Sequence, residues 1–257
     1  MEYIIICLAA LLTSGLTLFS GFGLGTLLMP VFAIFFPIDI AVAMTAIVHF
    51  LNNLFKLYLL GKHANKSVVL RFGLPAIITA LVGAQILVWL SGIDPLFQYE
   101  FLGKLLVVTP VKFIIAVLMI VFALFEIVPA LEKFSVEKKY LPLGGLLSGF
   151  FGGLSGHQGA LRSAFLVRCG LTKESFIATG VVIACLVDVS RLSIYASHFS
   201  SEGLSSNLNL LIAATLSAFL GAFIGNKLVK KVTMKAIQII VSIMLSAIAV
   251  GLGSGMI

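Results

Sequence analysis

Three basic residues stand inside apolar stretches of the chain: Lys56, Arg162 and Arg191. A cation within an apolar helix is energetically costly unless it faces a cavity or a partner. Arg162 closely follows His157 and Gln158, and a guanidinium can bind an oxyanion through two parallel hydrogen bonds. We therefore predict that Arg162 binds an anion, with His157 and Gln158 as further donors. A structural pair with Asp188 or an extension to the inner surface is the alternative for Arg162, and a helix cap is the alternative for the other two.

A carboxylate and an arginine lie three residues apart, at Asp188 and Arg191, so on a helix their side chains are neighbours. This spacing favours a structural ion pair. Apart from one glutamate near a span end, Asp188 is the only acidic residue well inside an apolar span, which makes it the candidate for proton coupling. Asn53 and Lys56 repeat the spacing 135 residues earlier, and a basic residue near each mouth would attract anions. For His49, on the same face, a packed and hydrogen-bonded side chain is favoured over a ligand.

Glycine-rich segments interrupt the apolar sequence twice, at Ser20–Gly25 and Ser148–Gly153, which begin 128 residues apart. Glycine adopts positive φ angles and lets a ligand approach the backbone. A half-helix after such a break presents free N–H groups and the positive end of its dipole, which favour an anion. Tight helix packing through glycine is the alternative. The predicted substrate-binding residues are Gly23, Gly25, Thr26, Asn53, Ser155, His157, Gln158, Arg162, Asp188 and Arg191.

The composition indicates a membrane protein, because 60% of the residues are hydrophobic and only 11% are charged, against about a quarter charged in soluble domains. The net charge of +7 fits cytoplasmic loops rich in Lys and Arg better than a nucleic-acid partner. The three cysteines lie in apolar segments without paired spacing and are expected to pack in the interior. No residue set has metal-ligand spacing and no phosphate-binding loop pattern occurs, so we expect no metal, no cofactor and no enzyme.

Apolar stretches that could cross a bilayer, which needs roughly 20 helical residues, set the expected elements. They are 3–20, 39–60, 72–90, 111–129, 176–197, 208–229 and 234–252. Shorter pieces at 26–36, 141–151 and 160–170 would each cover only about half of the hydrocarbon core. The predicted re-entrant helical hairpins are therefore 3–20 with 26–36, and 141–151 with 160–170. The segment 91–110 is predicted to form an amphipathic interfacial helix, with an outer cap as the alternative.

The basic residues predict the topology through the positive-inside rule. With the loop at 61–71 in the cytoplasm, twelve of the 17 Lys and Arg residues lie inside, two outside and three within the membrane. Each half then has three crossings and one hairpin, so the second half is inverted. We expect an all-α polytopic protein of the plasma (inner) membrane with repeats at 1–130 and 141–257, a cytoplasmic linker at 131–140, and both termini non-cytoplasmic. The offset between matched residues grows from 128 to 134, which places six extra residues, including Gly156–Gly159, after the second break.

The motifs Gly21–Gly25, followed by Pro30, and Gly149–Gly156 resemble those of the TauE/SafE family, also described as sulfite exporters. The repeat extends this resemblance over nearly the whole chain. It implies a permease in the lipid bilayer that moves a small sulfur-containing oxyanion, organosulfonate or carboxylate by alternating access, and a homodimer is compatible with it. Where a second proline is expected, the chain reads Gly156–Ser163 without one, so the substrate stays open. The alternatives are an anion channel and an intramembrane serine protease using Ser155.

Overall fold

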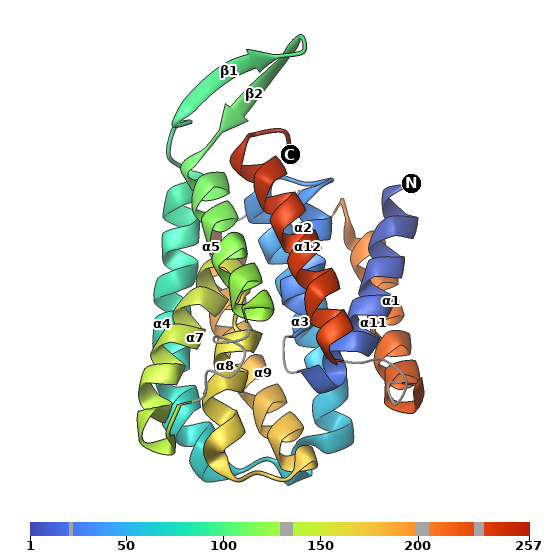
Figure 1. Cartoon of the computed structure of the whole chain (residues 1–257), viewed down its shortest axis with the longest axis vertical. Helices are drawn as coiled ribbons and strands as arrows, with labels where there is room; N and C mark the ends of the chain where they lie inside the picture. The colour runs from blue at the N-terminus through green and yellow to red at the C-terminus, as the bar shows by residue number, and fades with distance from the viewer. Residues whose placement is uncertain (21–22, 129–135, 199–205, 229–233) are drawn as a thin grey trace.

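The computed structural model describes residues 1–20, 23–128, 136–198, 206–228 and 234–257. Its helices form one bundle, and a two-stranded hairpin projects from one end (Figure 1). The first half contains α1 (Glu2–Ser20), α2 (Leu24–Ala33), α3 (Ile38–Leu60), α4 (Lys66–Ser91), β1 (Phe97–Phe101), β2 (Lys104–Val108) and α5 (Pro110–Ile127). The second half contains α7 (Leu141–Ser155), α8 (Gly159–Leu166), α9 (Lys173–His198), α11 (Leu208–Leu228) and α12 (Met234–Gly253). Short 3-10 turns are η1 (Gly61–His63), η2 (Lys138–Tyr140) and η3 (Val167–Cys169).

Four helices, α3, α4, α9 and α11, are long and apolar enough to cross a membrane. Three more, α1, α5 and α12, have 19, 18 and 20 residues and coincide with the remaining expected spans. In contrast, α2 has only 10 residues, all of them buried, and α8 has 8. The chain is therefore an all-α membrane protein with short helices in its interior.

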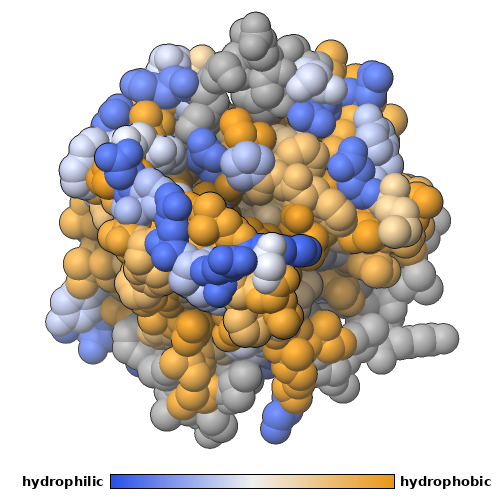
Figure 2. All heavy atoms as spheres, turned by 90° about the horizontal axis from the view of Figure 1, so that it is seen from above, coloured by the Kyte–Doolittle hydropathy of each residue, from blue (hydrophilic) through white to orange (hydrophobic). Residues whose placement is uncertain are grey.

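The surface of α4 shows what these helices present to their surroundings. Its exposed side chains include Leu70, Leu74, Ile78 and Trp89, each more than half exposed. Large apolar side chains at this exposure, repeated along one helix, suit contact with lipid chains rather than water. Figure 2 views the hairpin end, where hydrophilic side chains gather among hydrophobic ones.

The second glycine-rich segment, Ser148–Gly153, lies inside the continuous helix α7, so the predicted break at this place is wrong. A Cβ atom on any of three α7 glycines would come within 2.1 to 2.2 Å of a backbone oxygen of α4. These glycines are Gly145, Gly149 and Gly153, and the α4 oxygens belong to Phe72, Ala76 and Ala80. Spacing of four residues places the glycines on one helix face, so they allow the two backbones to pack in direct contact.

The helix pair α1 and α11 packs in the same way. A Cβ on Gly221 would lie 2.0 Å from the Leu11 oxygen, and one on Gly225 would lie 2.6 Å from the Cα of Gly15. In both pairs the first helix of one half packs against a long helix of the other half. Two further contacts also join the halves, since α3 packs against α9 and α5 against α12.

The segment 91–110 contains an antiparallel hairpin of β1 and β2, so the predicted amphipathic helix is wrong. Leu102 and Gly103 connect the strands with φ angles of 51° and 72°, as a two-residue hairpin turn with two positive φ angles requires. The Tyr99 hydroxyl donates a hydrogen bond of 2.6 Å to the Ser254 oxygen after α12. The hairpin therefore packs over the end of α12, which agrees with the alternative of a cap.

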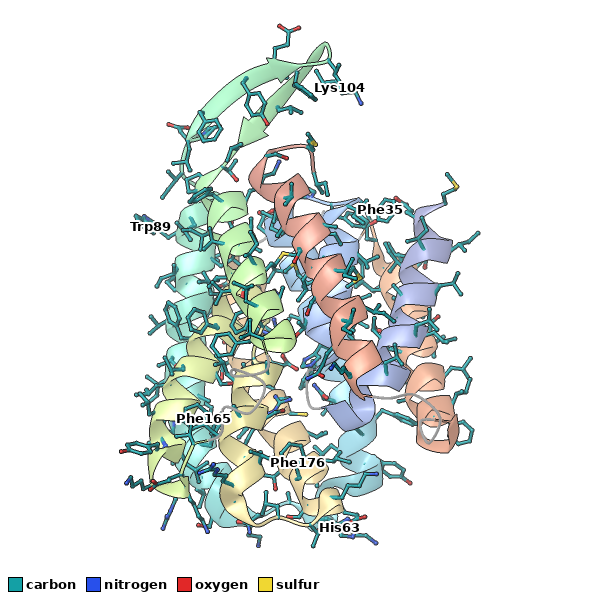
Figure 3. All side chains as sticks on the ribbon, in the orientation of Figure 1. Phe35, His63, Trp89, Lys104, Phe165 and Phe176 are labelled. Atoms are coloured by element: carbon teal, nitrogen blue, oxygen red, sulfur yellow. The ribbon has the colours of Figure 1, made fainter. Side chains whose placement is uncertain are left out.

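Both termini and the hairpin lie at one end of the bundle, while η1, η2 and η3 lie at the other (Figure 1). Figure 3 labels Lys104 at the hairpin end and His63 at the opposite end. The second end carries the basic residues Lys62, Lys66, Arg71, Lys138, Lys139, Arg168 and Lys173. We call it the basic end. Much of the expected linker at 131–140 lies outside the described residues.

Candidate functional site

Two helix breaks meet in the middle of the molecule. In the first, Gly23 has φ +81° and α2 begins at the next residue; residues 21 and 22 of the expected break lie outside the described residues. In the second, Gly156 has φ +81° and ends α7, and α8 begins at Gly159. The segment predicted as an insertion after the break therefore contains the break itself. A Cβ on Gly25 would lie 3.5 Å from the Gly156 oxygen, so the breaks touch, and both sites require glycine for conformation or space.

A buried ion pair lies beside the breaks. His49 Nδ1 on α3 is 2.6 Å from Asp188 Oδ2 on α9. Arg191 donates to Asp188 Oδ1 from Nη2 at 2.7 Å and from Nε at 3.0 Å, which confirms the predicted pair of Asp188 and Arg191. All three side chains are buried. The single carboxylate therefore faces one fixed cation and one histidine, and it joins the two halves of the chain.

Further hydrogen bonds attach this pair to the breaks. Gln158 Nε2 donates to Asp188 Oδ1 at 3.3 Å, and Asn53 Nδ2 donates to Oδ2 at 3.4 Å. Arg191 Nη1 also donates to the Gly152 oxygen at 3.4 Å. Because five donor atoms converge on or around one carboxylate, the breaks and the central helices are held as a unit.

Arg162 on α8 does not pair with Asp188. Its Nη1 donates to Gln158 Oε1 at 3.3 Å, so Gln158 stands between this arginine and the carboxylate. The alternative of an Arg162–Asp188 pair is therefore not formed among the described residues.

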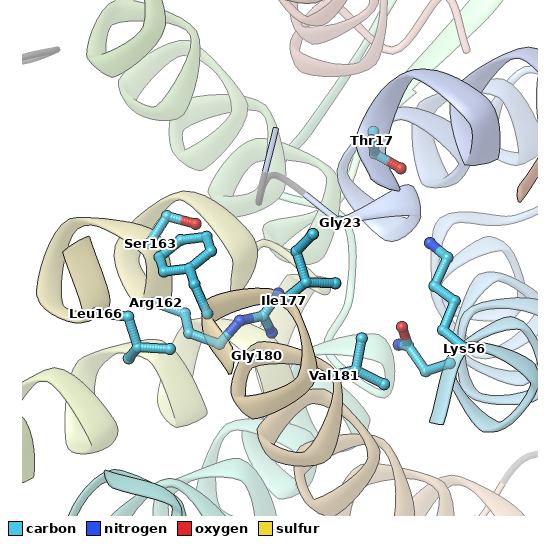
Figure 4. A pocket seen from close by; sticks show the side chains of 11 residues that line it. Thr17, Gly23, Lys56, Arg162, Ser163, Leu166, Ile177, Gly180 and Val181 are labelled. Carbon is cyan, nitrogen blue, oxygen red and sulfur yellow. The ribbon is translucent and has the colours of Figure 1, made fainter. Parts of the chain in front are cut away.

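Beside this network is a cavity of about 40 Å³. Figure 4 shows Lys56 and Arg162 on opposite sides of it, with Thr17 and Gly23 above. The cavity is lined by Thr17, Gly23, Asn53, Lys56, Arg162, Ser163, Leu166, Phe176, Ile177, Gly180 and Val181. Phe176 lies toward the basic end of the molecule (Figure 3). The cavity therefore lies on the basic-end side of the ion pair.

Lys56 and Arg162 are only 5% and 6% exposed. Within the described part of the chain, no carboxylate forms an ion pair with either. Three buried cations and one carboxylate, with His49 neutral, leave two positive charges: Lys56, Arg162 and Arg191 against Asp188. Burying an ion without a counter-charge is penalised by several kcal/mol even after relaxation. An anion in the cavity would supply the missing charge.

The predicted site residues divide into three groups. Those that line the cavity are Gly23, Asn53 and Arg162. Those behind it, in the hydrogen-bond network, are Gln158, Asp188 and Arg191. Four others do not line this cavity: Gly25, Thr26, Ser155 and His157. The structure also assigns Lys56 and Thr17 to the lining, although Lys56 was expected only to attract anions and Thr17 gave no signal beyond its place in an apolar helix.

Ser155 and His157 do approach each other, with His157 Nδ1 3.1 Å from Ser155 Oγ. However, Ser155 Oγ donates to the Phe151 oxygen, and both side chains are buried. The His157 ring stacks on Phe122 with centroids 5.2 Å apart. This pair has neither an adjoining cavity among the described pockets nor a carboxylate to orient the histidine, so it does not resemble the arrangement that activates a serine.

A polytopic membrane protein with interrupted helices around a buried, cation-lined cavity has the general design of a secondary transporter. The family comparison gives the narrower assignment. The family model described as sulfite exporter TauE/SafE matches residues 6–252, and the chain belongs to this family of transporters. No curated protein matches the chain.

Proposed function

We propose that the chain is a permease for a small anion, and that the anion binds between Lys56 and Arg162. One observation carries this proposal: two buried cations line one cavity and have no described carboxylate as partner. Lys56 comes from the first half of the chain and Arg162 from the second. An anion bound between them would therefore also contact both halves, as transport by relative movement of the halves requires.

The size of the cavity bears on the substrate class. Its 40 Å³ has room for about three water-sized spheres. A compact oxyanion such as sulfite, with four non-hydrogen atoms, suits this space better than an extended organosulfonate. Asn53 supplies a neutral amide beside the two cations, whereas the Thr17 hydroxyl donates to the Thr13 oxygen. A guanidinium presents paired N–H groups to an oxyanion. The family description, sulfite exporter, supports the same class.

An inverted repeat with alternating access accounts for the packing of the two halves, taken as 1–130 and 141–257 around a linker at 131–140. Under this repeat α1 corresponds to α7 and α4 to α11, so the pairs α1–α11 and α4–α7 are equivalent. Asn53 and Lys56 then correspond to Asp188 and Arg191, and Asn53 donates a hydrogen bond to its counterpart Asp188. In this arrangement Lys56 lines the cavity, whereas Arg191 forms an ion pair with Asp188.

The cavities on the two sides of α2 differ in size. A second cavity of about 470 Å³ lies at the other side of α2, lined by Ala33–Asp39 together with parts of α5 and α12. The buried body of α2 separates it from the Arg162 cavity. If the basic end is cytoplasmic, both termini are outside, as in a plasma-membrane protein of this topology, and the anion site lies toward the inner side.

Counterflow in proteoliposomes tests the proposal. Liposomes loaded with unlabelled anion take up the labelled anion against its gradient if a carrier is present, and the panel should contain sulfite, thiosulfate, methanesulfonate and acetate. We expect counterflow of a compact sulfur oxyanion, and its loss in Lys56→Met and Arg162→Gln. Lys62→Met and Arg71→Gln, exposed at the basic end, are the matched controls and should retain it.

Two results would contradict the proposal. Flux without counterflow would indicate a channel, the alternative function. Unchanged counterflow and unchanged half-saturating concentration in both Lys56→Met and Arg162→Gln would exclude this cavity as the anion site.

A further inference from the structure

We propose that the imidazole of His49 is the proton-binding group of this permease and that Asp188 is its fixed counter-charge, so the anion and a proton cross together. This inference rests on the proposed anion site. It assigns proton binding to a histidine of the first half of the chain and not to Asp188, which was the candidate from the sequence. The argument depends on the geometry around each group.

The surroundings of Asp188 are those of a permanent acceptor. Arg191 donates to Oδ1 twice, at 2.7 and 3.0 Å, and Gln158 donates to the same oxygen. A guanidinium has five N–H donors, no acceptor and a fixed charge. A protonated Oδ1 would therefore meet only hydrogen-bond donors, whereas the ionised carboxylate accepts hydrogen bonds from all of them.

His49 can change its charge, and one of its nitrogens lies near the cavity. Because Nδ1 faces a carboxylate oxygen at 2.6 Å, Nδ1 carries the hydrogen, and Nε2 is left to accept a proton. A Cβ on Gly23 would lie 3.3 Å from Nε2, and Gly23 lines the cavity. Because Gly23 has no side chain, His49 Nε2 lies close to the anion site. In this tautomer the amide of Asn53, another lining residue, donates to Nε2 at 3.3 Å, so Nε2 is the accepting nitrogen of the neutral ring.

The charges that face His49 link proton and anion binding. They are Asp188 and Arg191 from α9 and Arg162 from α8, and Lys56 lies two turns further along α3. The described basic residues of α4 and α5 lie within the first two turns of those helices, while α2 and residues 208–226 of α11 contain no ionisable group. With His49 neutral the buried set has two excess positive charges, and with His49 protonated it has three. An anion lowers this excess, so anion and proton favour each other's binding reciprocally.

Gln158 connects the two binding events physically. Its Oε1 accepts from Arg162 at 3.3 Å and its Nε2 donates to Asp188 at 3.3 Å. An oxyanion that binds the Arg162 guanidinium competes with Oε1, and any turn of this amide alters the bond to Asp188. Gln158 is therefore a positioning residue between the cavity and the His49–Asp188 pair. The proton itself passes from cavity water to Nε2 and returns to water on the other side, with no covalent change in the anion.

The test measures labelled thiosulfate and protons together in proteoliposomes that contain a pH-sensitive dye. Thiosulfate keeps its charge between about pH 5 and about pH 8, the range in which histidine changes charge, so any proton that moves belongs to the protein. We expect an alkaline interior to drive thiosulfate accumulation and thiosulfate entry to acidify the interior. His49→Gln should lose both effects, and any counterflow that it retains should no longer respond to the pH gradient. His198→Gln, at the exposed end of α9, is the matched control and should keep all three.

Gln158→Leu provides a second readout, because it should weaken the stimulation by the pH gradient more than it weakens counterflow. A purely structural role would reduce both equally. Wild-type counterflow without acidification would overturn the proton inference and leave the anion site standing. Acidification that persists in His49→Gln would also overturn it. Absence of wild-type counterflow for every anion of the panel would instead refute the proposed function. If His49→Gln loses counterflow as well, acidification of the interior by the wild type supports proton coupling, and its absence overturns it.

Discussion

The pair of Asp188 and Arg191 gives a sharp prediction about stability. Both side chains are fully buried, and the guanidinium makes two hydrogen bonds to Oδ1. Asp188→Asn keeps the shape of the side chain but leaves the Arg191 charge without its counter-charge. Breaking a buried pair by removing one partner costs about 3 kcal/mol or more. For a chain of this size that corresponds to a fall in Tm of roughly 6 to 12 °C.

The assay is thermal unfolding of the purified protein in detergent, followed by circular dichroism. The double variant Asp188→Asn with Arg191→Met removes both charges, so it should recover part of the lost stability, which a double-mutant cycle quantifies. Glu137→Gln is the matched control, because its pair with Lys139 is more than 60% exposed on both sides and such pairs contribute little. A Tm of Asp188→Asn equal to that of the control, or a double variant less stable than the sum of the single ones, would refute the reasoning.

Two further predictions concern packing and the hairpin. Gly149→Val should abolish folding, seen as loss of the monodisperse peak in size-exclusion chromatography, because its Cβ would lie 2.2 Å from the Ala76 oxygen; Gly92→Ala, whose Cβ has its nearest neighbour at 3.7 Å, should behave as wild type. Tyr99→Phe should lower the free energy of unfolding by about 1 kcal/mol, through loss of the bond to Ser254, with unchanged counterflow; a loss of counterflow would show that the hairpin takes part in transport.

The helices were predictable from the sequence because apolar length and charge placement are local properties. All seven expected long spans coincide with helices in the described residues. The hairpin carries strand signals in the sequence beside the charged and aromatic residues that favoured an amphipathic helix. Phe97, Tyr99 and Phe101 alternate along one strand, and Leu102–Gly103 forms the turn. Alternation with a glycine turn is a hairpin signal that does not depend on tertiary contacts.

The site was only partly predictable, because contacts between helices leave little trace in sequence spacing. The pair of Asp188 and Arg191 follows from a separation of three residues. The contact of His49 with Asp188 spans 139 residues, and neither residue type alone distinguishes a packed histidine from a partner. Lys56 matched Arg191 in the repeat, yet its place in the cavity depends on how α3 meets α8. The glycines of α7 could indicate either a break or close packing, and their partner α4 decides between them.

The glycine-mediated pairs have a consequence for biogenesis. Since α1 packs backbone to backbone against α11, α1 acquires its partner only after residues 21–207, which separate the two helices, have been synthesised. The glycine face of α7, by contrast, packs against α4, which is synthesised before it. The first half alone therefore leaves α1 without its partner. Two fragments divided between α5 and α7 should each be degraded when expressed singly and should accumulate only when expressed together.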